Sequence, residues 1–140
     1  MSYPPLVKYG GEGDYRAHYE KVYCRGPIET FDGIKVRFRK SRFDHCFYDT
    51  VVTQDDTFSQ KRAERIDWIK AALQDSSADL YQGWDRDRKQ VDASRRVTAV
   101  QGDYVVVIQM TGAGRADFIT AFVADSPSTI GKIRGMPKWA

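Results

Sequence analysis

The sequence is poor in the residues that build metal sites, disulfide frameworks and membrane anchors. Only two of its 140 residues are cysteine and only two are histidine. Cys24 and Cys46 form no CxxC pair, so neither a zinc site nor a disulfide framework is expected. The longest apolar run, residues 104–108, has the length of a strand and is far too short to cross a membrane.

The first residues also lack a recognisable targeting signal. Residues 1–5 (MSYPP) contain no basic region followed by an apolar segment, which is what a secretory signal requires. Because a signal, a membrane span and a disulfide framework are all missing, the sequence predicts a protein of the reducing cytoplasm that does not act at a membrane. Transfer to another cell by a route without a signal peptide stays open.

Motifs for common cofactors and catalytic groups are missing as well. The chain has no P-loop, no GxGxxG after a strand, no HExxH helix and no GxSxG elbow. Two carboxylate pairs, Asp55 with Asp56 and Asp85 with Asp87, could hold Mg²⁺, but solvated turns explain both pairs. A metal-dependent nuclease is therefore the weakest alternative, and we assign no cofactor and no metal ligand.

What the sequence does contain is enough apolar material for one folded domain, and a small excess of positive charge. Hydrophobic residues make up 41% and aromatic residues 13% of the chain, as in globular proteins. The net charge of +3 permits nucleic-acid binding without requiring it. Basic residues gather in two clusters, one just before His45 (Lys35, Arg37, Arg39, Lys40, Arg42) and one near the C-terminus (Lys132, Arg134, Lys138). If these clusters meet in space, they form one cationic surface.

Local signals divide the chain into an arm and a domain. Residues 1–26 are rich in glycine and tyrosine and are expected to form an N-terminal arm that packs poorly or docks late. Residues 27–140 are expected to form a single α+β domain. It begins with a hairpin, because Asp32-Gly33 separates two strand-like segments, the second of which alternates apolar with basic residues.

The rest of the domain is predicted as helices followed by strands. Helices are expected at 41–48 and from 57 to about 74, the second with a buried stripe of Ala63, Ile66, Ile69 and Leu73. Sequential strands follow at 80–84, 95–101, 104–110 and 117–124, and Ser126-Pro127 begins a short C-terminal helix. The predicted fold is thus N-terminal helices packed on a roughly four-stranded antiparallel meander sheet.

One histidine lies off the apolar face of the helix predicted at 41–48. At about 100° per residue, one face carries Phe43, Cys46 and Phe47 and the other carries Asp44, His45 and Tyr48. A histidine outside the core, beside a carboxylate and a phenol, is available for proton transfer. The simpler interpretation is a solvated surface histidine. Cys46, on the apolar face, is interpreted as a small buried hydrophobe.

Five short segments resemble a known family: RFDHCFY (42–48), ERIDWI (64–69), LYQGWD (80–85), RRV (95–97) and FITAF (118–122). Through them, residues 34–139 resemble the superfamily that joins barnase, EndoU, colicin RNases and RelE toxins, and more closely its phage and mobile-element branch. The resemblance implies a metal-independent RNase with helices before an antiparallel sheet whose concave face holds the active site. RNA is then the expected partner, and an inhibitor or antitoxin protein is a second candidate partner.

The resemblance also implies catalytic roles. Cleavage of RNA through its own 2′-OH needs a base, an acid and cations around the phosphate. His45 would be the acid/base, Arg95 or Arg96 the phosphate clamp, and Thr120 a strand hydroxyl. Because neighbouring side chains of a strand point to opposite faces, only one of the two arginines can enter the site.

Substrate binding is assigned to Lys40, Arg42, Tyr81, Trp84 and Lys132. Of these, Lys40, Tyr81 and Lys132 are the alternatives for the second acid/base group, whereas His18 is disfavoured because it falls in the predicted arm. Trp84 could stack on a nucleobase, although a rim residue that covers the core is the simpler interpretation. Trp68 is interpreted as core packing, and Trp139 as an anchor for the tail. The competing hypothesis is a non-enzymatic module of the same fold that binds nucleic acid or a protein.

Overall fold

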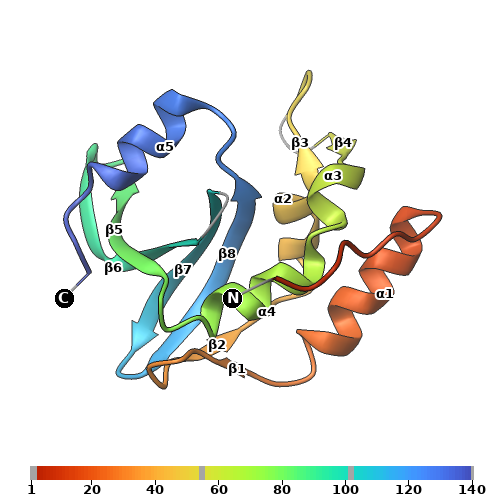
Figure 1. Cartoon of the computed structure of the whole chain (residues 1–140), viewed down its shortest axis with the longest axis horizontal. Helices are drawn as coiled ribbons and strands as arrows, with labels where there is room; N and C mark the ends of the chain where they lie inside the picture. Colours follow the sequence, from red (N-terminus) through yellow and green to blue (C-terminus); the bar gives the residue numbers. More distant parts are fainter. Residues whose placement is uncertain (1–2, 54–55, 101–102, 140) are drawn as a thin grey trace.

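The computed structural model describes residues 3–53, 56–100 and 103–139. In chain order the elements are α1 (Glu12–Val22), β1 (Ile28–Glu29), β2 (Lys35–Arg37), α2 (Arg42–Phe47), β3 (Tyr48–Asp49), β4 (Thr57–Phe58), α3 (Gln60–Ala63), α4 (Ile66–Leu73), β5 (Asp79–Asp85), β6 (Gln90–Val100), β7 (Tyr104–Gly112), β8 (Arg115–Val123) and α5 (Pro127–Arg134). Helices α1 to α4 lie together on one side of the sheet, and α5 lies apart from them over β5 and β6 (Figure 1). The α+β class is therefore confirmed.

The main sheet is larger than predicted and is mixed rather than antiparallel. Its six strands follow the order β1-β2-β8-β7-β6-β5. The antiparallel meander β5 to β8 is confirmed, and so is the predicted β1–β2 hairpin. However, β2 pairs in parallel with the start of β8, which joins the hairpin to the meander. The two paired segments are about 80 residues apart in the chain, and no local sequence pattern indicates that they pair. The parallel pairing could therefore not be predicted from the sequence. A second, two-stranded sheet pairs β3 with β4.

The N-terminal residues belong to the core, so the prediction of a poorly packed arm is wrong. Tyr15, Tyr19 and Tyr23 have no exposed surface. They follow one another at intervals of four, which places them on one face of α1 and its C-terminal cap. Each hydroxyl donates to a backbone carbonyl of another segment, at 2.6–2.8 Å. A buried tyrosine contributes a large apolar surface, but its hydroxyl still needs a hydrogen-bond partner. Because the segment is rich in glycine, its composition did not indicate a helix.

The helix predicted from 57 to about 74 is two helices, α3 and α4, that meet at Glu64-Arg65. Ser59 rather than Thr57 caps α3, because its hydroxyl accepts from the backbone N–H of Arg62 at 3.2 Å. The predicted apolar stripe is confirmed, since all four of its residues are fully buried. The apolar stripe therefore predicted the buried face of both helices correctly, although the segment is not one continuous helix.

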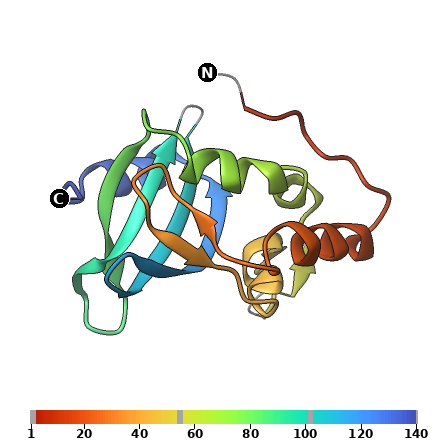
Figure 2. The same cartoon turned by 90° about the horizontal axis from the view of Figure 1, so that it is seen from below.

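The sheet curves strongly, and an ion pair with one buried partner joins two of its non-neighbouring parts. In a flat sheet, β1 and β6 would lie four strand spacings apart, roughly 19 Å. Yet the Arg96 guanidinium on β6 donates to the carboxylate of Asp32, in the β1–β2 turn, at 2.7 Å. The hairpin accordingly crosses in front of the sheet on the side of α4 (Figure 2). The main core lies on this concave side, and a smaller core around Tyr81, Val97 and Val105 lies beneath α5.

Gly83 shows how tightly the meander is packed at its irregular point. The pairing of β5 with β6 shifts register between Gln82 and Gly83. A Cβ atom on Gly83 would lie 2.5–2.8 Å from the first three side-chain carbons of Arg95. We expect Gly83→Ala to destabilise the fold by about 1–3 kcal/mol, the usual cost of overpacking, in urea unfolding followed by circular dichroism. If the cost arises from this clash, adding Arg95→Ala should recover most of it. Equal stability of Gly83→Ala and the wild type would contradict the prediction.

Candidate functional site

The helix that carries His45 packs against the open edge of β8. Since β2 pairs only with the first three residues of β8, the rest of that edge is free of a strand neighbour, and α2 covers it. The Cys46 thiol donates to the carbonyl of Ala121 at 3.6 Å and also hydrogen-bonds the Thr120 side chain. Phe43, Cys46 and Phe47 are buried, as predicted, and His45 on the other face is half-buried. The fold thus brings the helix of His45 and the strand position of Thr120 to one corner.

A groove opens beside this corner, between α3, the start of α4 and the end of β8. Its volume is about 340 Å³. The lining combines cations, carboxylates and apolar side chains: Asp49, Ser59, Lys61, Arg62, Arg65, Tyr104, Phe122, Val123 and Asp125. Three cations face two carboxylates, which leaves an excess of one positive charge. We refer to these nine residues as the groove.

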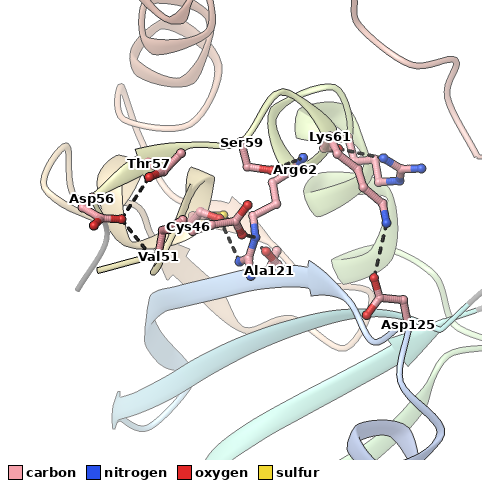
Figure 3. Close-up of polar contacts among 11 residues, drawn as sticks. Cys46, Val51, Asp56, Thr57, Ser59, Lys61, Arg62, Ala121 and Asp125 are labelled. Atoms are coloured by element: carbon pink, nitrogen blue, oxygen red, sulfur yellow. Dashed lines mark hydrogen bonds and ion pairs between the residues drawn. The ribbon is translucent and has the colours of Figure 1, made fainter. Parts of the chain in front are cut away.

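Hydrogen bonds and ion pairs position the groove cations. Arg62 bonds the carboxylate of Asp49 at 2.8 Å and the carbonyl of Cys46 at 3.4 Å, which ties α3 to the end of α2. Lys61 pairs with Asp125 at 3.3 Å across the groove (Figure 3). Both pairs are partly exposed to solvent, with 32% and 62% of the Arg62 and Lys61 side chains accessible. A surface pair of this kind is worth little, so an incoming anion can displace either carboxylate at small cost.

Arg65, one of the residues that line the groove, has a buried donor without a partner in the described part of the chain. One of its terminal nitrogens donates to the carbonyl of Lys61 at 2.7 Å, whereas its Nε is buried and has no hydrogen-bond partner among the described residues. Buried donors are normally satisfied, so this atom marks a place where a ligand or water belongs. Tyr104 and Phe122 supply the apolar part of the lining, and burial raises the pKa of Tyr104 well above its ordinary value.

The structure corrects the expectation for Arg96. The side chain of Arg96 has no exposed surface and pairs with Asp32, so it cannot touch an RNA phosphate in this conformation. Arg95 is half-buried, lies across Gly83 and donates to the side chain of Gln109 at 3.0 Å. Arg95 is therefore the member of the pair that solvent reaches, but it lies on β6, two strands away from Thr120 on β8. The sequence predicted that the two arginines point to opposite faces of β6. It did not show which of these faces is covered by the β1–β2 hairpin.

The residues assigned to substrate binding do not gather at one place. Lys40 and Arg42 lie at the start of α2, Trp84 is 47% exposed on β5, and Lys132 is exposed on α5. Tyr81 is only 3% exposed, and its hydroxyl accepts from Arg134 and Lys138. This burial corrects the expectation that Tyr81 contacts RNA.

The two basic clusters lie toward opposite edges of the sheet and do not merge. The first lies on and around β2 and the start of α2, and the second lies on α5, which packs on β5, and on the segment that follows it (Figure 1). In the first cluster, Arg37 and Arg39 share the carboxylate of Asp117 at 3.1 and 3.3 Å. The hydrogen bond from Arg37 holds the pKa of Asp117 below its usual range. One carboxylate thus offsets one of the five positive charges of the first cluster.

Asp56 and Asp85, one carboxylate from each acidic pair, accept hydrogen bonds from backbone N–H groups close by in the chain. Asp56 accepts from the backbone N–H groups of Val51, Val52 and Thr53 at 2.8–2.9 Å, and these bonds hold its pKa well below the ordinary value (Figure 3). Asp85 accepts from the backbone N–H groups of Asp87 and Arg88 in the β5–β6 turn. Asp55 lies outside the described residues. Within residues 3–53, 56–100 and 103–139, no three His, Cys, Asp or Glu side chains are arranged to hold a metal ion, and no helix is long and apolar enough to span a membrane.

His18 has a position that its place in the sequence did not suggest. Its Nε2 lies 2.7 Å from Asp67 on α4, and its Nδ1 lies 2.9 Å from the Tyr9 hydroxyl. These bonds fasten α1 to α4 and keep His18 away from the groove lining. The groove cations Lys61 and Arg62 were not selected from the sequence as site residues. The available signal was that Arg62 and Arg65 lie outside the apolar stripe of their helix.

Comparison of the chain with protein-family models, curated proteins and solved structures found no match.

The reactivity of the buried Cys46 thiol measures how often α2 separates from β8. Burial raises the pKa of its thiol to about 12. In a Cys24→Ser variant, we expect iodoacetamide to leave the folded protein unlabelled at pH 8 and to label Cys46 fully in guanidinium chloride, as measured by intact mass. Labelling of the folded protein at the rate seen in denaturant would show that α2 opens readily from β8.

Proposed function

We propose that this chain is a metal-independent endoribonuclease whose groove holds the scissile phosphate. The observation that carries the proposal is the meeting of the His45 helix, the Thr120 strand position and the groove cations at one corner. The net positive charge of the groove and the unpartnered Nε of Arg65 suit a phosphate oxygen. The apolar lining next to these cations suits a ribose or a base.

In the proposed reaction, His45 takes the proton from the ribose 2′-OH, and the 2′-oxygen attacks phosphorus. The bond from phosphorus to the 5′-oxygen breaks, and Lys61 supplies the proton to that oxygen. The products are a 2′,3′-cyclic phosphate and a 5′-hydroxyl, so no redox partner is needed. Arg62 and Arg65 stabilise the charge that grows on the phosphoryl oxygens, and the Thr120 hydroxyl donates a further hydrogen bond.

The test is cleavage of end-labelled single-stranded RNA in excess EDTA. We expect the wild type to produce cyclic-phosphate ends and to leave DNA and 2′-O-methyl RNA intact, because both lack the attacking hydroxyl. Arg62→Ala should lower the rate by about 10²- to 10³-fold, as expected when a donor to the developing charge is lost. Arg25→Ala removes the same charge from an exposed loop and should keep the wild-type rate.

Absence of cleavage by a folded wild type, with or without EDTA, would contradict the proposal for these substrates. Cleavage that EDTA abolishes would instead contradict its metal independence. The competing function is nucleic-acid binding without turnover, supported by the exposed Lys35, Arg37, Arg39 and Lys40. In that case affinity, not cleavage, should fall when these residues are replaced, with a steep salt dependence.

A further inference from the structure

Arg96 is an arginine fully buried against the concave face, and most of its hydrogen-bonding capacity is unused. Its Nη1 donates to Asp32 at 2.7 Å. Its Nε and Nη2 are buried and have no hydrogen-bond partner in the part of the chain that the structure describes. Nε and Nη2 form the edge of a guanidinium that binds two oxygens of one carboxylate or phosphate. The edge best suited to an oxyanion is therefore the empty one.

A second buried polar group lies on the same face of β6. Thr98 has no exposed surface, and its hydroxyl has no partner within the described ranges. Thr98 follows Arg96 by two residues on β6, so both side chains point to the same face, about 7 Å apart along the strand. Together the unpartnered atoms carry four hydrogens to donate, three on nitrogen and one on oxygen. What they lack is an acceptor.

Two aromatic rings and a short strap cover this position. The ring centres of Phe31 and Trp139 lie 5.5 and 5.8 Å from the guanidinium carbon of Arg96. Trp139 belongs to a segment that extends the sheet beyond β5. The backbone N–H of Trp139 donates to the carbonyl of Leu80 at 3.0 Å, and the backbone N–H of Gln82 donates to the carbonyl of Pro137 at 2.8 Å. Two longer hydrogen bonds of 3.4 Å, from Gln82 to the Lys138 carbonyl and from the Lys138 side chain to Tyr81, also hold this strap. All of these bonds join the strap to the edge strand β5, so the strap can lift away without unfolding the main core.

We propose that Arg96 and Thr98 form an internal binding site for one small oxyanion, a carboxylate or a phosphate, which enters beneath the Trp139 strap. The anion places two oxygens on the Nε–Nη2 edge and accepts the Thr98 hydroxyl. A water molecule suits these unpartnered donors less well than an oxyanion does. Each water adds two hydrogens that need acceptors of their own, and donors already outnumber acceptors among the unpartnered atoms. The site is separate from the groove, and a phosphodiester inside an RNA chain is too large to enter it.

The Nε–H of Arg96 reports directly on occupancy in a ¹H–¹⁵N NMR spectrum. The full chain, in buffer free of phosphate and carboxylate, is titrated with inorganic phosphate and separately with acetate, with chloride as the ionic-strength control. We expect a saturable shift of the Arg96 Nε–H resonance with one or both oxyanions and none with chloride. A response to phosphate alone or to acetate alone identifies the class of ligand.

Two variants test the assignment. Thr98→Val keeps the shape of the side chain and removes the hydroxyl, so it should weaken binding by about fivefold. Arg96→Lys keeps the charge and removes the two-oxygen edge, so saturable binding should be lost, as followed in this variant by the backbone amide resonance of Thr98. The proposal is overturned if neither oxyanion shifts the wild-type resonance, if Thr98→Val binds as tightly as the wild type, or if a crystal grown with phosphate and acetate shows only water at Arg96.

Discussion

Replacing His45 by alanine is expected to lower the rate of RNA cleavage by about 10²- to 10⁴-fold, the range for losing a general acid or base. His45 lies on the face of α2 opposite Phe43, Cys46 and Phe47, which hold that helix to the core. The substitution should therefore leave the fold intact, with an unchanged circular dichroism spectrum and a melting temperature close to that of the wild type. The measurement is single-turnover cleavage of labelled RNA in EDTA.

The control is His45→Gln, which keeps a polar side chain of similar size but cannot carry a proton at neutral pH. Both variants should lose turnover while retaining RNA affinity, because the groove cations remain. A second readout is the pH profile of the cleavage rate, which should lose one limb in both variants if His45 acts as the general acid or base. Cleavage by His45→Gln at the wild-type rate would remove His45 from the mechanism.

Replacing Asp32 by alanine is expected to destabilise the fold by about 3–5 kcal/mol, because it leaves the buried guanidinium of Arg96 without its counter-charge. Arg96 has no exposed side-chain surface, whereas 34% of the Asp32 side chain is accessible. Burial opposes ionisation of the Asp32 carboxyl, but hydrogen bonds from Arg96 and Thr30 outweigh it and lower the pKa. This stabilisation is therefore present above the unfolded-state pKa of Asp32 and is lost as the pH falls through its folded-state pKa.

Urea unfolding at neutral pH measures the loss. The matched control is Asp79→Ala, which removes a carboxylate from the exposed pair with Arg134 and should cost no more than about 1 kcal/mol. In the double variant Asp32→Ala with Arg96→Met, the charge and its counter-charge are both gone, so much of the stability should return. A cost for Asp32→Ala as small as that for Asp79→Ala would contradict the view that this pair closes the curved sheet.

Where the sequence predicted structure correctly, the signal was local. The Asp32-Gly33 turn requires a positive φ at Gly33, observed at 88°, which glycine adopts freely. The alternation of apolar and basic residues along β2 gave its buried face, and the stripe from Ala63 to Leu73 gave that of α3 and α4. In both cases, neighbours in the chain decide which face is apolar.

Where the sequence failed, distant segments decided the outcome. Tyr15, Tyr19 and Tyr23 become core residues only because other segments offer carbonyls to their hydroxyls. Arg96 is buried because the sheet curves until the β1–β2 turn reaches β6. The resemblance directed attention to His45 and Thr120, but it did not select Arg62, whose position depends on how α3 packs against the end of α2.

The sequence by itself determined the α+β class, the meander of the last four strands, the buried faces of the helices and the position of His45 off the core face of its helix. Only the tertiary structure decided which cations line a groove, which arginine is buried and that β2 joins β8. The physical reason is the range of the interactions. Turn geometry and amphipathic periodicity act within a few residues, whereas sheet curvature, parallel pairing and the convergence of charges depend on contacts between segments far apart in the chain.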